Sequence, residues 1–380
     1  MKVLVVDDSA TSRAVLQRAV RELGHDCVLA EDGEDGWRRF LQESPVAVIS
    51  DWVMPGVDGI ELCRRIREDD GAPYTYFVML TSREDKASAL RAMRAGVDDF
   101  LTKPLDTHEL EMRLIAASRV TAVHHRLAAR TREMHEEVRT AACVQRGLLP
   151  RDPPTVAGVT LGGMSVPAAE VGGDYYDFMT TPAGEVVLVI ADVAGHSISS
   201  ALLMAVGRTV LREQVGKGLA PDEVLEATNA SMYEDLGNAG LFITLFCASY
   251  DPVGGLLRFA NGGHNPPLLR RADGTVSELD ADGAPAGILP FVGFELGEVR
   301  LGPGDHVVLY TDGIPEAGME RGDPFGDERL AALVATAGAA APAELGRRIH
   351  AAVVEHAGAQ SARRDDVTVA GLRVEARTGI

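Results

Sequence analysis

The chain has 380 residues, more than one ordinary domain needs, so two or three domains are expected. Hydrophobic residues make up 46% of the sequence, which is enough to bury sizeable cores. The formal net charge of −19 argues against nucleic acid as a partner, because no basic stripe is available to neutralise phosphates. An acidic chain of this kind is compatible with the binding of divalent metal ions.

Cysteine usage and the apolar runs indicate the compartment. The four cysteines lack the CxxC spacing of a zinc site and do not suggest a disulfide framework. The apolar run Lys2–Val6 is too short for a signal-peptide core, and no run approaches the roughly 20 residues of a membrane span. We therefore expect a cytoplasmic protein in a reducing environment, with no membrane partner.

Residues 1–122 alternate apolar strands with helical patterns, which predicts a first domain with a parallel sheet covered by helices on both faces. Five strands are expected, at Lys2–Val6, Cys27–Ala30, Val46–Ser50, Tyr76–Leu80 and Phe100–Leu101. Ligands of such sheets bind at the carboxyl ends of the strands. The residues that follow the strands are therefore the first candidates for a site.

Acidic, hydroxyl and ammonium side chains follow four of these strands. They are Asp7 and Asp8 after the first, Asp51 after the third, Thr81 after the fourth and Lys103 after the fifth. Each alone has an ordinary explanation, such as helix capping. Together they predict a pocket for one Mg²⁺, a nucleophilic carboxylate, and a hydroxyl and an ammonium that contact a phosphoryl oxygen.

This set resembles the receiver domain of two-component response regulators, and the segments Asp51–Gly59 and Gly96–Pro104 support the resemblance. It implies a doubly wound, flavodoxin-like sheet of five parallel strands in which Asp51 accepts a phosphoryl group. The groups that it assigns to Mg²⁺ are Asp7, Asp8, Asp51 and the carbonyl of Val53. The residues that it assigns to the phosphoryl group and to switching are Thr81, Lys103 and the aromatic Phe100.

A helical pattern without Gly or Pro then runs from Asp106 to Arg146, which at 1.5 Å per residue is a rod of roughly 60 Å. Within it, residues 123–149 are expected to form a linker between the domains. A heptad-like 4-3 spacing is kept by Leu127, Thr131, Met134, Val138, Ala141, Gln145 and Leu148. The small and polar members of this seam predict a marginal coiled coil, and the alternative is a helix that packs on the next domain.

Residues 150–376 predict a second domain, an antiparallel α+β layered β-sandwich flanked by helices. Seven strands are expected, at Thr160–Ser165, Val186–Ile190, Phe242–Tyr250, Gly255–Ala260, Pro267–Arg270, His306–Tyr310 and Val367–Val374. Four helices are expected, at Ser200–Val215, Pro221–Leu236, Glu328–Thr336 and Pro342–His356.

Aspartates stand beside the ends of these strands. Asp192 stands at the end of the buried strand Val186–Ile190, at the sheet edge, and a turn is expected to begin over Val193–His196. The other such residues are Asp174, Asp312, Asp365 and Asp366. A lone Asp in this position is more often a helix cap or a turn former. Several carboxylates brought together from strand ends instead suit oxygen-seeking cations such as Mg²⁺ or Mn²⁺.

Six segments of this region, in order, resemble those of metal-dependent PPM-type serine/threonine phosphatases of the SpoIIE/RsbU-like branch. They are Gln145–Pro150, Val171–Asp177, Ala191–His196, Ala260–Pro266, Tyr310–Gly313 and Asp365–Thr368. The resemblance implies two Mn²⁺ or Mg²⁺ ions bridged by Asp192. It assigns Asp174 and the Val193 carbonyl to one ion and Asp312 and Asp365 to the other. The alternative is that Asp366, the neighbour of Asp365, also binds the second ion.

Two cations about 3.5–4 Å apart can acidify a bridging water and stabilise an in-line phosphoryl displacement, so no Ser or Cys nucleophile is required. Asn261 and His264 lie in a glycine-rich corner. Hydrogen bonding within the fold is the expected role of these two residues, and contact with substrate is the alternative.

The two resemblances together imply a response regulator with a phosphatase output that acts on phosphoserine or phosphothreonine of a protein, under the control of Asp51 phosphorylation. The implied substrate is an anti-sigma-factor antagonist. The other implied partner is a cognate histidine kinase or phosphotransfer protein. The heptad-like seam of the helix predicts a second copy of the chain as a further partner. The alternative is a non-catalytic signalling adaptor with a phosphatase-like fold. Four mutually repelling carboxylates argue against it, because they are costly to keep together without catalysis.

Overall fold

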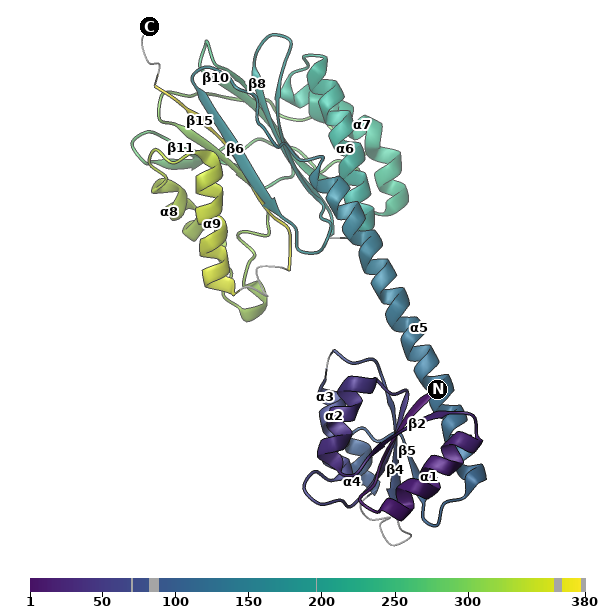
Figure 1. Ribbon diagram of the computed structural model, residues 1–380. Coiled ribbons are helices and arrows are strands. Elements are labelled where there is room, and N and C mark those ends of the chain that lie inside the picture. The colour runs from purple at the N-terminus through teal and green to yellow at the C-terminus, as the bar shows by residue number, and fades with distance from the viewer. Residues whose placement is uncertain (70, 82–88, 196, 359–363, 377–380) are drawn as a thin grey trace. The chain divides into compact units, whose positions relative to one another are not determined.

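The computed structural model in Figure 1 describes residues 1–69, 71–81, 89–195, 197–358 and 364–376. His196, the last residue of the segment around Asp192, lies outside them. The chain forms two compact units, Met1–His135 and Glu136–Ile380, and helix α5 (Thr107–Arg146) contains the division between them. Among the described residues, no helix has both the length and the apolar character that crossing a membrane requires.

The first unit contains a parallel sheet of five strands in the order β2-β1-β3-β4-β5. The strands are β1 (Lys2–Val6), β2 (Asp26–Ala30), β3 (Ala47–Asp51), β4 (Tyr76–Thr81) and β5 (Asp99–Thr102). The helices before α5 are α1 (Ala10–Glu22), α2 (Gly33–Glu43), α3 (Gly59–Glu68) and α4 (Ala89–Arg94). The predicted doubly wound fold is confirmed, and the strand boundaries differ from the predicted ones by at most one residue.

The alternation of side chains in each strand buries both faces of this sheet. Val3 and Val5 of β1 pack with residues of α1 and α5, whereas Leu4 and Val6 pack with residues of α2 and α3. Because both faces are covered, a polar ligand can reach the sheet only at the ends of its strands. The strand order reverses between β1 and β3, which is where such folds bind ligands.

The second unit consists of two five-stranded antiparallel sheets in the orders β13-β10-β9-β8-β7 and β12-β11-β14-β15-β6. The first contains β7 (Asp174–Thr180), β8 (Val186–Val193), β9 (Ile243–Asp251), β10 (Leu256–Gly262) and β13 (Gly297–Arg300). The second contains β6 (Val159–Val166), β11 (Leu268–Arg270), β12 (Val276–Glu278), β14 (His306–Tyr310) and β15 (Val367–Val374). Apolar residues of both sheets share one core, so the sheets are stacked, which confirms the predicted sandwich.

Helices cover the outer faces of both sheets (Figure 1). They are α6 (Ile198–Gly216) and α7 (Pro221–Ala239) on the first, and α8 (Gly326–Ala335) and α9 (Pro342–Ala357) on the second. The last turns of α5 also belong to this unit, because Ala142 packs with Val171 and with Ala201 of α6. The second unit is therefore a four-layer arrangement of helices, two sheets and helices.

Three strands were not expected from the sequence, and β8 extends three residues beyond its expected end. The unexpected strands are β7, β12 and β13. Strand β7 was missed because Asp177 interrupts the apolar pattern that predicts a buried strand. Asp177 is buried, but it pairs with Arg212 and accepts a hydrogen bond from the Tyr175 hydroxyl. Strand β8 continues to Val193, so the turn that was expected to begin at Val193 begins one residue later. Asp192 has a strand partner on each side.

Candidate functional site

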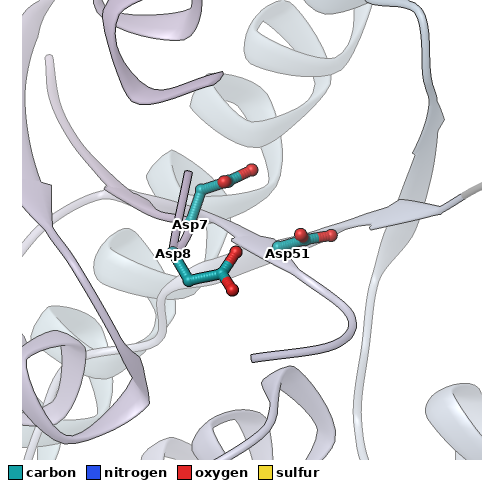
Figure 2. A group of neighbouring side chains, drawn as sticks. All are labelled: Asp7, Asp8 and Asp51. Carbon is teal, nitrogen blue, oxygen red and sulfur yellow. The ribbon is translucent and has the colours of Figure 1, made fainter. Parts of the chain in front are cut away.

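Three carboxylates of the first unit lie together at the carboxyl ends of β1 and β3. Figure 2 shows Asp7 and Asp8, which follow β1, beside Asp51, the last residue of β3. One oxygen of each lies within 4.8 Å of the others, and no other trio of His, Cys, Asp or Glu among the described residues is grouped as closely. Asp7 is buried, Asp51 is half-buried and Asp8 is exposed. This donor set is suited to one Mg²⁺ that solvent can reach.

The carboxylate of Asp7 is fixed by the first turn of α1. Its Oδ1 accepts from the backbone N–H of Ser9 at 2.9 Å, and its Oδ2 accepts from the Ser12 hydroxyl at 2.7 Å. Ser9 is also the N-cap of α1 and accepts from the backbone N–H of Ser12. The turn that Ser9 caps also orients the carboxylate of Asp7, so the capping explanation and the metal-site explanation do not exclude each other.

Lys103 enters the cluster from the residue after β5. Its Nζ lies 2.8 Å from Asp51 Oδ2 and 3.2 Å from Asp7 Oδ2. Burial lowers the pKa of the Lys103 ammonium, but the hydrogen bonds and charges of Asp51 and Asp7 outweigh it and raise the pKa overall. The ammonium therefore stays charged beside the proposed phosphoacceptor, where it can bind a phosphoryl oxygen.

The remaining residues expected in the receiver site lie at the same end of the sheet. Thr81 ends β4 and accepts from the backbone N–H of Lys103 through its carbonyl at 3.0 Å. Val53 lies in the loop after β3 and is 71% exposed, and because its side chain is a hydrocarbon only its backbone carbonyl could contribute to a metal site. Phe100 stacks on Trp52 with a centroid separation of 6.3 Å. The sequence analysis missed Trp52, although its position next to Asp51 could have indicated it.

The second group of carboxylates lies in the second unit and comes from both sheets. Asp174 of β7 is the register partner of Asp192 of β8 in one sheet. Asp312 follows β14 by two residues and Asp365 precedes β15 by two residues, and these strands are neighbours in the other sheet. Strand register therefore brings together the four aspartates that are far apart in sequence.

Mutual repulsion identifies Asp192 as the centre of this group. Burial, followed by the charges of Asp312, Asp365 and Asp366, raises the pKa of Asp192 to about 7. Burial and then the charge of Asp192 raise the pKa of Asp174 well above its usual value. Burial and then the charge of Asp365 raise the pKa of Asp312 to about 6. This surplus of negative charge is suited to neutralisation by divalent cations.

Asp366 differs from the other four because its oxygens accept from backbone groups. Oδ1 accepts from the N–H of Ala168 at 2.7 Å, and Oδ2 accepts from the N–H groups of Gly173 at 2.6 Å and Asp174 at 3.3 Å. These hydrogen bonds connect the segment before β7 to the residue that precedes β15. The contacts of Asp366 therefore position Asp174.

Close backbone approaches explain two glycines of the site. A Cβ on Gly173 would lie 2.5 Å from the Val193 carbonyl oxygen, and a Cβ on Gly313 would lie 2.1 Å from the Asp366 carbonyl oxygen. Any other residue at either position would displace backbone that carries the cluster. The Val193 carbonyl, an expected metal ligand, thus lies against the segment that carries Asp174.

Thr311 is a site residue that the sequence analysis did not single out. Its hydroxyl donates to Asp174 Oδ2 at 2.8 Å and accepts from the backbone N–H of Thr368 at 3.0 Å. Thr311 is fully buried and joins the two sheets directly beneath the carboxylates. Its place between Tyr310 and Asp312 in a motif segment was the available signal.

Asn261 and His264 use their hydrogen-bonding groups within the fold. The Asn261 amide donates to the His264 carbonyl and accepts from its N–H. The His264 ring lies 2.8 Å from the Thr244 hydroxyl and 3.1 Å from the Tyr310 carbonyl, and burial lowers its pKa to about 4. A neutral ring that donates to this carbonyl and accepts from this hydroxyl satisfies both nitrogens, so the expected role within the fold is the one that the contacts support.

The raised pKa values predict how the metal-free protein responds to pH. Because the Asp192 pKa of about 7 exceeds the value of about 3.9 in an unfolded chain, the folded state holds the extra proton between these pH values. Its stabilising contribution is present below about pH 4 and is lost as the pH rises to about 7. We expect calorimetry in EDTA to show a second unit that loses stability over this range. The loss should be smaller in Asp192→Asn, and equal slopes in the two proteins would contradict the assignment.

Comparisons with known proteins agree with the two units. Residues 3–115 match the response regulator receiver domain family, and residues 182–375 match the family described as Stage II sporulation protein E (SpoIIE). The CheY homolog of Campylobacter jejuni, a chemotaxis protein, is 37% identical over 116 residues, which are 30% of this chain and 89% of that protein. The fold and the sites thus define a receiver domain joined to a domain of the PPM phosphatase fold.

The SpoIIE match covers half of the chain, and the chain belongs to the SpoIIE family. Phosphoserine phosphatase RsbU of Bacillus subtilis is 32% identical over 200 residues, which are 52% of this chain and 59% of RsbU. The chain therefore spans less than two thirds of that relative. The SiaA-PP2C domain of Pseudomonas aeruginosa has a similar structure, with a TM-score of 0.57 and 27% identity over 65% of this chain and 100% of that chain.

Proposed function

We propose that the chain is a response regulator whose output is a Mn²⁺- or Mg²⁺-dependent serine/threonine protein phosphatase. The observation that carries the proposal is the position of Asp192, which faces Asp174 in its own sheet and has a pKa raised by burial and then by the charges of Asp312 and Asp365 from the other. A carboxylate with acidic neighbours on both sides is suited to bridge two cations.

Each residue of this group has a role in the proposal. Asp192 would contribute to both ion positions, Asp174 and the Val193 carbonyl would hold one ion, and Asp312 and Asp365 would hold the other. When bound, two divalent cations supply Lewis-acid stabilisation for transfer of a phosphoryl group to water. The buried Thr311 hydroxyl holds Asp174 in orientation for this role. Asp366 positions the segment before β7, which is the contribution that its backbone contacts support.

The first unit supplies the regulatory site of the proposal. Asp51 accepts a phosphoryl group from a histidine kinase or phosphotransfer protein, while Asp7 and Asp8 hold Mg²⁺. Lys103 already lies 2.8 Å from Asp51 and can neutralise the added charge. Thr81 binds a phosphoryl oxygen and Phe100 changes position. In this proposal residues 1–122 form the receiver, 123–149 the linker and 150–376 the phosphatase.

The substrate class in the proposal is a protein that carries phosphoserine or phosphothreonine. RsbU, the relative that matches the second unit, is itself a phosphoserine phosphatase. The specific substrate that we propose is an anti-sigma-factor antagonist, and its identification requires the phosphorylated partner. A cytoplasmic location is part of the same proposal.

An assay of the purified chain on p-nitrophenyl phosphate tests the proposed activity. We expect hydrolysis with Mn²⁺ or Mg²⁺ and none with EDTA, because no protein nucleophile takes part. An inactive chain that still binds the two ions at the carboxylates of the second unit would favour the alternative, a signalling adaptor. The same assay on a phosphoseryl peptide separates general phosphoester hydrolysis from action on proteins.

Helix α5 supports a homodimer as part of this proposal. All its residues from 122 to 137 are exposed, and Leu127 and Met134 of the heptad-like seam are 64% and 63% exposed. An amphipathic seam that is exposed in one chain can be buried against a second copy. Because the seam also contains Thr131 and Ala141, pairing is expected to be weak enough for receiver phosphorylation to shift it.

Charge placed in the seam should weaken this pairing. We expect Met134→Glu with Val138→Glu to weaken association at least about tenfold, about 1.4 kcal/mol, because like charges then face each other. The response of phosphatase activity to a beryllofluoride mimic of phosphorylated Asp51 should also decrease. Light scattering and turnover measure the two effects. As a control, Ala129→Glu with Thr140→Glu adds the same charges outside the seam, and equal dimerisation and response in both variants would exclude the seam as the coupling element.

A further inference from the structure

The last turn of α5 is hydrogen-bonded to the segment that carries the candidate metal site. The side-chain amide of Gln145 donates from Nε2 to the Gly172 carbonyl at 2.7 Å, and its Oε1 accepts from the Gly172 N–H at 3.1 Å. The side chain of Gln145 thus makes hydrogen bonds to both backbone polar groups of Gly172. In the sequence, Gln145 belongs both to the heptad-like seam and to the segment Gln145–Pro150 that supports the phosphatase resemblance, and the contacts of its half-buried side chain lie in the second unit.

Gly172 lies two residues before Asp174, one of the candidate metal-binding carboxylates. The next residue, Gly173, has its Cα so close to the Val193 carbonyl that a Cβ would lie 2.5 Å from that oxygen. The residue after it is Asp174, the register partner of Asp192. The segment 172–174 is therefore held from two sides, by Asp366, the residue before β15, and by Gln145 of α5.

The space around Gly172 leaves little freedom for this segment. A Cβ on Gly172 would lie 2.3 Å from Asp366 Oδ2, so the backbone is packed against that carboxylate. Ala142, one turn before Gln145, packs with Val171, the residue before Gly172. The contacts of Ala142 and Gln145 fix two successive residues of the segment from the same face of α5, one by packing and one by hydrogen bonds.

We propose that Gln145 is a positioning residue for the metal site, which holds Gly172 so that Asp174 and the Val193 carbonyl are in place to bind one of the two cations. This inference rests on the proposed function of the second unit and extends it to a residue of the linker. Residues that orient metal ligands typically contribute a factor of about 10 to 100 in metal affinity. Loss of the two hydrogen bonds should therefore weaken Mn²⁺ binding without removing any ligand.

The test variant is Gln145→Met, which keeps the length and the helix propensity of the side chain but lacks its donor and acceptor. The matched control is Val144→Met, a change to the same residue at the neighbouring position, where the side chain is 66% exposed. Gln145→Glu keeps the acceptor for the Gly172 N–H and loses the donor, and it serves if the first variant does not fold. The metal-free melting temperature of each full-length protein verifies folding.

Mn²⁺ binding by the full-length proteins is measured by electron paramagnetic resonance of the free ion. The Asp192→Asn chain reports ions bound outside the phosphatase site and is subtracted. We expect Gln145→Met to raise the dissociation constant about tenfold or more, Gln145→Glu to raise it in the same direction, and Val144→Met to change it by less than about twofold. The Mn²⁺ concentration that gives half-maximal phosphatase activity should shift in parallel.

Equal Mn²⁺ affinity in Gln145→Met and wild type would overturn the positioning role, as would an equal loss in Val144→Met. Failure of the proposed function gives a different result, because Asp192→Asn would then bind as much Mn²⁺ as wild type.

Discussion

Asp192→Asn is expected to reduce phosphatase turnover by at least about a thousandfold, which corresponds to about 4 kcal/mol in the activation barrier. Asp192 lies opposite Asp174, and its pKa is raised by burial and then by the charges of Asp312 and Asp365. An amide at this position removes the one negative charge shared by both proposed ion positions. Steady-state hydrolysis of p-nitrophenyl phosphate at saturating Mn²⁺ measures the loss.

The fold should survive this change, because the carboxylate that is removed is repelled by its neighbours in the metal-free protein. Metal-free melting should therefore be unchanged or slightly higher than in wild type. Asp280→Asn, the same change at an exposed position, is the matched control and should retain full activity. Turnover of Asp192→Asn within a factor of a few of wild type would rule out the two-ion assignment.

Asp51→Asn is expected to abolish the uptake of a phosphoryl group from acetyl phosphate in the presence of Mg²⁺. Asp51 is the half-buried member of the trio with Asp7 and Asp8, and Lys103 lies 2.8 Å from its Oδ2. An amide is not nucleophilic enough to form the acyl phosphate. Incorporation of labelled phosphate that is released by base measures the reaction, and the variant should remain at the level of the reaction without protein.

Asp58→Asn is the matched control for this experiment. Asp58 is the N-cap of α3 and accepts from the backbone N–H of Glu61, and Asn caps helices about as well as Asp. This control should be phosphorylated like wild type. If Asp51→Asn gained a base-labile phosphate at the wild-type level, another residue would be the acceptor, and the response to beryllofluoride would need a different explanation.

The fold of the receiver unit and the candidate residues of its site could be predicted because these residues directly follow strands. A parallel sheet brings the carboxyl ends of its strands together, so Asp7, Asp51 and Lys103 could be expected to meet before any contact was known. The one residue missed there, Trp52, makes its contact with Phe100 across two strands. No periodicity in the sequence reports such a pairing.

The phosphatase unit could be predicted in its layers and its aspartates, but not in the contacts that hold the aspartates. Asp366 and Gly173 are separated by 193 residues, and Thr311 and Asp174 by 137. Strand register decides whether such residues meet, and the sequence leaves the register open when a strand such as β7 contains buried charge. For the same reason the end of β8 was expected too early, because pairing with β7 and β9 extends this strand to Val193.

Anomalous diffraction from crystals grown with Mn²⁺ tests the central claim, that the carboxylates around Asp192 form a two-ion site. We predict two anomalous peaks in the second unit, both in contact with the carboxylate of Asp192. One should lie beside Asp174 and the Val193 carbonyl, and the other beside Asp312 and Asp365. A map with no peak at these carboxylates, or with a single ion that does not touch Asp192, would contradict the account.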